Sequence, residues 1–84
     1  MVQVSYKIKN EEGLHARPAS DFCKTASRFK SNIAVIKDGE EFEAKSILMV
    51  LCVGAVKDDV IEIRADGEDE REAIDALIET LDME

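Results

Sequence analysis

The spacing of the hydrophobic residues changes several times along this 84-residue chain, and the order of these changes limits its fold. Between Val2 and Ile8 every second residue is hydrophobic, which is typical of a strand with one buried face. From Ala16 to Phe29 the spacing is three or four residues, which predicts an amphipathic helix ending near Lys30. Shorter strand-like runs follow at 33–36, 41–44 and 60–65.

Turn and cap residues mark the boundaries of the middle elements. Asp38 and Gly39 supply a hairpin turn between two short strands. Ser46 precedes the apolar run 47–53 and Gly54 follows it, which predicts a short helix with both ends capped.

A last helix is predicted near the C-terminus, because Asp69 and Glu72 have the spacing of a capping box. Its buried stripe would consist of Ala73, Ile74, Leu77, Ile78 and Leu81. The order strand, helix, strand, strand, helix, strand, helix predicts an α+β fold with a largely antiparallel sheet and helices over one face. We expect one domain spanning residues 1–84. A chain of this size buries roughly 60% of its unfolded surface, so any site should be shallow.

The net charge of −8 limits the partners. Binding to nucleic acid or to an anionic membrane requires a basic surface. The first ten residues lack the apolar core of a signal peptide, and no apolar run approaches the ~20 residues that span a bilayer. We therefore expect a cytoplasmic protein that binds neither nucleic acid nor membrane.

The two cysteines, Cys23 and Cys52, both lie within apolar patterns. Because no export signal precedes them, we expect reduced, buried thiols. One histidine and two scattered cysteines do not have the spacing of a zinc site, so we expect no metal and no cofactor.

The segment GLHARPAS, residues 13–20, contains the only histidine, His15, and the only proline, Pro18. Proline suits the first turn of a helix, so the helix should begin at about Ala16 with His15 near its N-cap. The free amides of Ala16 and Arg17, with the Arg17 guanidinium, would then form a cradle for phosphate. A nucleophile beside such a cradle favours transient phosphorylation of His15. The alternative is that His15 is only a tolerated cap residue, and the residues alone leave this open.

Three segments resemble the HPr family, the histidine-containing phosphocarriers of the bacterial phosphoenolpyruvate-dependent sugar phosphotransferase system. GLHARPAS is similar to the active-site signature of that family. AKSILMVLCVGA, residues 44–55, is similar to the segment around its regulatory serine, and VIEIRADGEDE with the following helix resembles its ending. The resemblance implies an open-faced β-sandwich of four antiparallel strands with three helices on one face, in the order βαββαβα.

The resemblance implies a phosphoryl relay. His15 would accept a phosphoryl group on Nδ1 from Enzyme I and pass it to the Enzyme IIA domain of a sugar permease, while Arg17 would bind the phosphate oxygens. Ser46 would be a regulatory phosphorylation site for HPr kinase/phosphorylase, and the phosphorylated form would act with catabolite control protein A in catabolite repression. Such a protein is a phosphoryl carrier and not an enzyme, and we expect a monomer.

The second helix and two lysines correspond to the partner-docking side of the family. Ile47 and Leu48 would be exposed docking residues rather than core residues, whereas for Leu51 both interpretations stay open. Lys24 and Lys45 would supply positive charge for an acidic partner.

Acidic residues near the active-site segment depart from the family pattern. Glu12, beside Glu11, stands where relatives often carry a small or hydroxylated residue, and it would oppose an incoming phosphate. Asp21 lies four residues after Arg17 and should pair with it. Two other functions remain: a regulatory paralogue that works only through its serine, against which His15 argues, and a small acidic interaction domain whose match is accidental.

Overall fold

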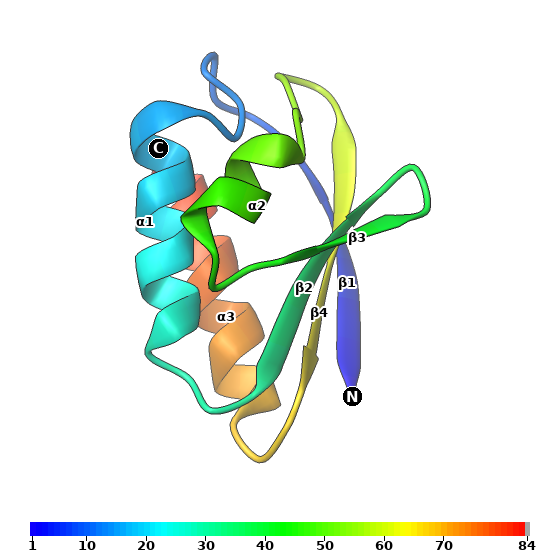
Figure 1. The fold of residues 1–84 in the computed structure, drawn as a ribbon, viewed down its shortest axis with the longest axis vertical. Coiled ribbons are helices and arrows are strands. Elements are labelled where there is room, and N and C mark those ends of the chain that lie inside the picture. The colour runs from blue at the N-terminus through cyan, green and yellow to red at the C-terminus, as the bar shows by residue number, and fades with distance from the viewer. Residues whose placement is uncertain (84) are drawn as a thin grey trace.

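The computed structural model describes residues 1–83 and has the expected order of strands and helices (Figure 1). The elements are β1 (Val2–Lys7), α1 (Ala16–Ser27), β2 (Asn32–Lys37), β3 (Glu40–Glu43), α2 (Ile47–Cys52), β4 (Val60–Asp66) and α3 (Glu70–Asp82). The α+β order predicted from the hydrophobic spacing is confirmed.

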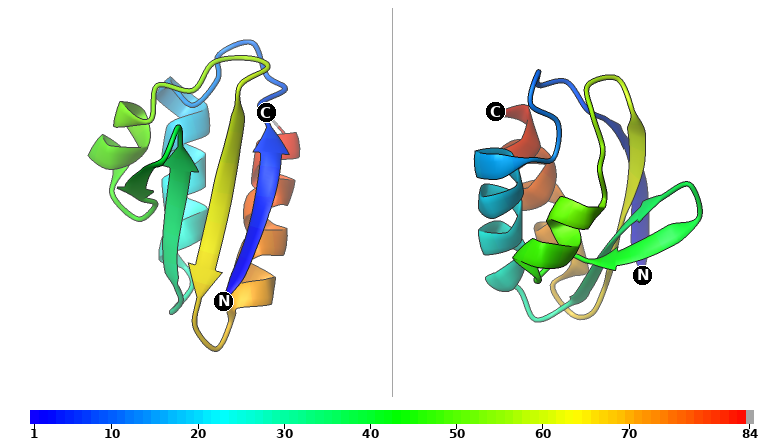
Figure 2. Two further views of the ribbon diagram at one scale, coloured as in Figure 1. Left: turned by 90° about the vertical axis from the view of Figure 1, so that its right-hand side faces the viewer. Right: turned by 45° about the horizontal axis from the view of Figure 1, so that its top comes forward.

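The four strands form one antiparallel sheet in the order β1-β4-β2-β3. Helices α1 and α3 lie side by side over one face of this sheet, and α2 packs against α1 (Figures 1 and 2). Among the described residues, no helix covers the opposite face. The open-faced arrangement is therefore confirmed, with α1 and α2 together on the same side of the molecule.

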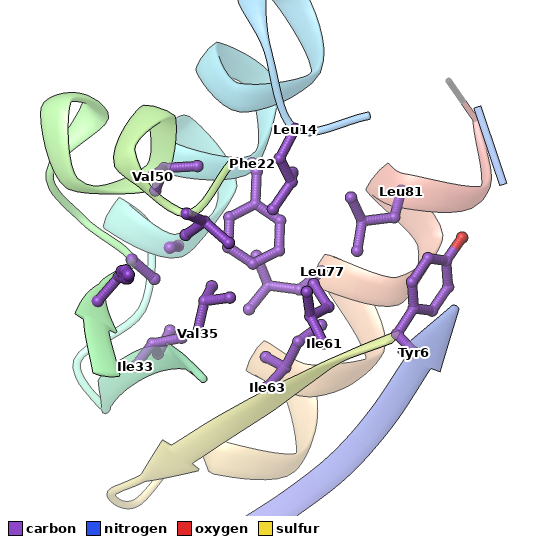
Figure 3. Close-up of a cluster of buried hydrophobic side chains, with 14 of the residues drawn as sticks. Tyr6, Leu14, Phe22, Ile33, Val35, Val50, Ile61, Ile63, Leu77 and Leu81 are labelled. Carbon is purple, nitrogen blue, oxygen red and sulfur yellow. The ribbon is translucent and has the colours of Figure 1, made fainter. Parts of the chain in front are cut away.

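The hydrophobic core lies between the sheet and the helices, as Figure 3 shows. Phe22 of α1, Leu77 of α3 and Ile63 of β4 are fully buried there. Burying a side chain of this size contributes about 1.5–3 kcal/mol. Leu14 is also fully buried, so the residue directly before His15 anchors the start of α1 in the core.

Helices α1 and α2 end earlier than their apolar patterns suggest. α1 ends at Ser27 rather than near Lys30, because the amides of Arg28 and Phe29 bond to carbonyls three residues back and tighten the chain. α2 stops one residue before the end of the apolar run 47–53. Phe29 still packs against the core from beyond the helix, which explains why the apolar spacing continues past the helix end.

The predicted capping box of Asp69 and Glu72 is wrong. The Asp69 carboxylate makes no cap bond and instead accepts hydrogen bonds from the hydroxyl and amide of Ser31 and from the amide of Lys30. These bonds lower the pKa of Asp69 to about 2. Glu70 accepts a bond from the amide three residues before it, at 3.1 Å, and so closes the turn before α3.

The expectation of two buried thiols is also wrong. Both cysteines are free, but Cys52 is exposed and Cys23 is half-buried. The Cys23 thiol donates a hydrogen bond to the carbonyl of Lys45 at 3.1 Å. The physical reason for the exposure of Cys52 is that α2 buries only Val50 and turns most of its apolar side chains outward.

Candidate functional site

The loop that leads into α1 is pressed against the segment after α2. The amide of Leu14 donates to the carbonyl of Ala55 at 3.0 Å. Gly13 has φ +65°, and a Cβ at this position would lie 2.2 Å from the same carbonyl oxygen. Only glycine combines this φ with such a close approach, so the contact determines how the chain enters the next residue, His15.

His15 is the N-cap residue of α1, as the position of proline predicted. Its backbone is extended, with φ −128° and ψ 161°, and its side chain makes no cap hydrogen bond. The residue is exposed, whereas Pro18 and Ala19 in the following turn are buried. The imidazole is therefore presented to solvent from a turn that is anchored on its other side.

Ala16, the first residue of α1, has φ +51°. A left-handed backbone costs an L-residue with a Cβ about 1–2 kcal/mol relative to the ordinary helical conformation. The first amides of a helix have no acceptor within it, so the amides of Ala16 and Arg17 are available to an anion. The two amides that would form the predicted cradle therefore lie beside His15 on a strained turn.

Arg17 projects into solvent, with 85% of its side chain exposed. Its Nε lies 3.7 Å from Oδ2 of Asp21, which is the pairing expected from the four-residue spacing. An exposed pair of this kind contributes only about 0.3–0.5 kcal/mol, so a phosphate can take the guanidinium from Asp21.

Two glutamates stand in the loop before His15. Glu11 pairs with Lys57, with 3.5 Å between Oε1 and Nζ, and this pairing partly offsets its charge. Glu12 is exposed, and no hydrogen bond or ion pair to another described residue engages it. Glu12 is therefore the carboxylate that remains to repel an anion approaching the imidazole.

Helix α2 presents an apolar surface to solvent. Leu48 is 69% exposed, and Ile47 and Leu51 are exposed by 42% and 39%. Core packing is thus excluded for Leu51, the residue for which the sequence left both interpretations open. Met49 is 37% exposed and joins this surface, which sequence reasoning missed because an apolar run alone does not tell which residues face outward. We call Ile47, Leu48, Met49 and Leu51 the α2 patch.

The polar residues around α2 are placed in three different ways. Ser46 is the N-cap residue, and its hydroxyl accepts a hydrogen bond from the amide of Met49 at 3.4 Å, as predicted. Lys24 is exposed on α1. Lys45 is half-buried, and its ammonium donates to the carbonyl of Phe29 at 2.7 Å, so its charge is directed at the chain just beyond α1.

The surroundings of His15 form a surface and not a cleft. Three shallow hollows are lined by other residues: one on the open face of the sheet around Arg64, one between α1 and α3, and one at the start of α3. Within residues 1–83 no group of three potential metal ligands comes together. None of the helices in this part of the chain is long and apolar enough to cross a membrane.

Together these features suit a reaction in which the second reactant arrives on another macromolecule. An exposed imidazole can act as a nucleophile, the helix amides and Arg17 can hold an anionic group, and the α2 patch can dock a partner beside them. Small-molecule chemistry, in contrast, usually needs an enclosed pocket.

Comparisons with known proteins agree with this chemistry. The family model described as "PTS HPr component phosphorylation site" matches residues 2–82. Phosphocarrier protein HPr of Buchnera aphidicola subsp. Schizaphis graminum is 44% identical over 77 residues, which are 92% of this chain and 91% of the relative. The structure of HPr-C-His from Thermoanaerobacter tengcongensis is 45% identical with a TM-score of 0.94, covering 98% of this chain and 92% of that one. An HPr dimer from the same organism is 44% identical with a TM-score of 0.79, covering 99% and 95%.

Proposed function

The chain belongs to the HPr family of phosphocarrier proteins, and from this premise we propose that His15 is the residue that carries the phosphoryl group. The family exchanges phosphoryl groups with components of the phosphotransferase system such as Enzyme I and Enzyme IIA, and its members are carriers and not enzymes. Membership in this family excludes the alternative that the chain is an unrelated acidic interaction domain. The observation that carries the proposal is the exposed imidazole at the N-terminal end of a 12-residue helix, next to Arg17.

The transfer is a displacement at phosphorus. The lone pair on Nδ1 of His15 attacks the phosphorus of the phosphohistidine on Enzyme I. As the new N–P bond forms, the N–P bond on Enzyme I breaks, and the donor imidazole leaves with its electron pair. The amides of Ala16 and Arg17 and the guanidinium of Arg17 hold the phosphate oxygens while charge develops on them. The same steps in reverse pass the group to a histidine on Enzyme IIA.

The variant His15→Ala tests the nucleophile. It should fold normally, because the side chain is exposed and makes no cap bond, and it should accept no phosphate from Enzyme I and phosphoenolpyruvate. Phosphohistidine is labile in acid whereas phosphoserine is stable, so acid treatment identifies the product. Ser46→Ala is the control and should still acquire acid-labile phosphate. Acid-labile phosphate on His15→Ala would refute the assignment.

The variant Arg17→Ala tests the phosphate contact. Acceptance should continue through the helix amides but slow about 10- to 100-fold, the loss expected for one charged hydrogen bond. Arg28→Ala is a matched control, because Arg28 is the C-cap residue about 16 Å from Arg17 along α1. Equal transfer rates in the two variants would remove Arg17 from the site.

We also propose that Ser46 is a regulatory site that HPr kinase/phosphorylase phosphorylates. The phosphorylated form would then bind catabolite control protein A in catabolite repression. The hydroxyl lies at the edge of the α2 patch, so about two added negative charges would fall within the surface that docks an acidic Enzyme I. The fold should change little, because the added charge lies at the N-terminal end of α2.

The variant Ser46→Asp tests the repulsion. Phosphate acceptance should slow through a higher KM for Enzyme I, and saturating Enzyme I should restore the rate. Ser5→Asp adds the same charge to an exposed position of β1 and should have a smaller effect. A rate that stays low at saturating Enzyme I would point to a change at His15 itself.

The α2 patch with Lys24 is the proposed docking surface for Enzyme I and for the Enzyme IIA domains of sugar permeases. The patch is apolar, and the exposed Lys24 and Arg17 on α1 supply positive charge, which suits a partner with an acidic rim. We further propose that residues 1–84 form one domain, and that it acts as a cytoplasmic monomer. A relative forms a dimer, so light scattering across a range of protein concentrations is the test of the monomer.

A further inference from the structure

Lys45 links α1 to the segment that leads into α2. Its ammonium donates to the carbonyl of Phe29 at 2.7 Å, just beyond the C-terminal end of α1. Its own carbonyl accepts a hydrogen bond from the thiol of Cys23 at 3.1 Å. The ammonium of Lys45 is therefore bonded to the chain just beyond α1, and its backbone carbonyl is bonded to α1 itself. Helix α2 begins two residues later.

Helix α2 is short and has a small buried face. It contains six residues and buries only one of them, Val50. The other end of the segment is held where the carbonyl of Ala55 accepts the amide of Leu14. Besides its packing on α1 and β3, the segment that contains α2 is therefore tied by hydrogen bonds at two places, one near each end of α1.

The position of the Lys45 ammonium is chemically well matched. The last carbonyls of a helix lack partners within it and carry partial negative charge, so a cation is favoured there. The Phe29 carbonyl lies in this region, because α1 ends at Ser27 and the chain tightens directly afterwards. A neutral side chain of the same length would leave this carbonyl without its donor.

We propose that Lys45 is a positioning residue: its ammonium holds the α2 patch in register with His15 and Arg17 on α1. It acts through the orientation of α2 and does not contact the partner. This inference rests on the proposed docking function of the α2 patch. It differs from the sequence expectation, in which Lys45 is a docking charge like Lys24.

The two roles predict different responses to salt. A docking charge attracts its partner through solvent, so its contribution shrinks as the Debye length falls from about 10 Å at 0.1 M salt to 3 Å at 1 M. A half-buried hydrogen bond within the molecule is screened much less. Phosphate transfer from Enzyme I should therefore be measured with Lys45→Met and Lys24→Met at about 0.05 M and 0.5 M salt.

For Lys45→Met we expect KM to rise about fivefold at both salt concentrations with little change in kcat, less than the loss for one charged hydrogen bond because α2 keeps its other contacts. For Lys24→Met the rise in KM should approach zero at high salt. Lys45→Arg should recover most of the affinity, since a guanidinium can also donate to the Phe29 carbonyl. A KM for Lys45→Met that is unchanged, or that returns to the wild-type value at high salt, would overturn the proposal.

A second measurement needs no partner. The amide of Val50 donates to the carbonyl of Ser46 at 3.0 Å, so its hydrogen exchange reports the opening of α2. Exchange should quicken about fivefold in Lys45→Met and stay unchanged in Lys24→Met. Wild-type exchange in Lys45→Met would refute the positioning role. If the wild-type protein accepted no phosphate from Enzyme I, the carrier function would fail, while the exchange result would still decide whether Lys45 holds α2.

Discussion

Replacing Ala16 by glycine should have the opposite sign from most such changes in helices. Glycine in place of alanine normally destabilises a helix interior by about 0.8–1.0 kcal/mol. Ala16, however, has φ +51°, a conformation that costs about 1–2 kcal/mol with a Cβ and almost nothing without one. The residue is exposed, so its methyl group contributes little buried area. The gain and the entropic loss nearly cancel, and we expect a change between zero and about 1 kcal/mol of stabilisation.

The matched control is Ala76→Gly, in the interior of α3. This variant should lose about 1 kcal/mol, so the two glycine variants should differ by about 1–2 kcal/mol. Urea unfolding followed by circular dichroism resolves such a difference, because an m-value near 1 kcal/mol per M separates the midpoints by about 1–2 M. If Ala16→Gly is destabilised as much as Ala76→Gly, the backbone of Ala16 is not strained in solution.

Three further changes test the acidic loop, the α2 patch and the junction before α3. Glu12→Ser should speed transfer from a heterologous Enzyme I, most clearly at low salt, and a rate unaffected by salt would show that this carboxylate faces away from the site. Leu48→Ala should raise KM for Enzyme I several-fold with less than ~0.5 kcal/mol change in the free energy of unfolding, because the side chain is 69% exposed. Asp69→Asn should lower Tm at pH 7. Because hydrogen bonds led by that of the Ser31 hydroxyl depress its pKa to about 2, the wild-type protein should lose this advantage as pH falls from about 4 to 2. An exposed control, Asp75→Asn, should leave the acid limb of the Tm profile unchanged, and so should Asp69→Asn if these bonds are absent in solution.

Elements whose signals are local could be predicted from the sequence. The strand and helix order follows from hydrophobic spacing, and the start of α1 follows from Pro18. The cap at Ser46 is also a local signal, because its acceptor role involves an amide only three residues away. These features need no knowledge of how distant segments pack.

Features that depend on distant partners could not be predicted. The Asp69 carboxylate has the spacing of a capping box, yet its donors lie 38 and 39 residues earlier in the chain. Two backbone amides and a hydroxyl outcompete the single amide that a cap would provide. The hydrogen bond of the Lys45 ammonium could not be predicted for the same reason, since its carbonyl acceptor lies 16 residues earlier.

Prediction from local sequence fails most clearly at the candidate site, and the two failures there have the same cause. An alanine at positive φ begins α1, and most of an apolar run faces solvent on α2. Selection for stability alone would remove both features, because the backbone of Ala16 stores strain and the α2 patch leaves apolar area in water. Each fits the proposed function: the strained turn presents Ala16 and His15 to solvent, and the α2 patch would be buried only in the proposed complex. Departures from local consistency are expected at functional sites, and here two of them adjoin the proposed docking surface.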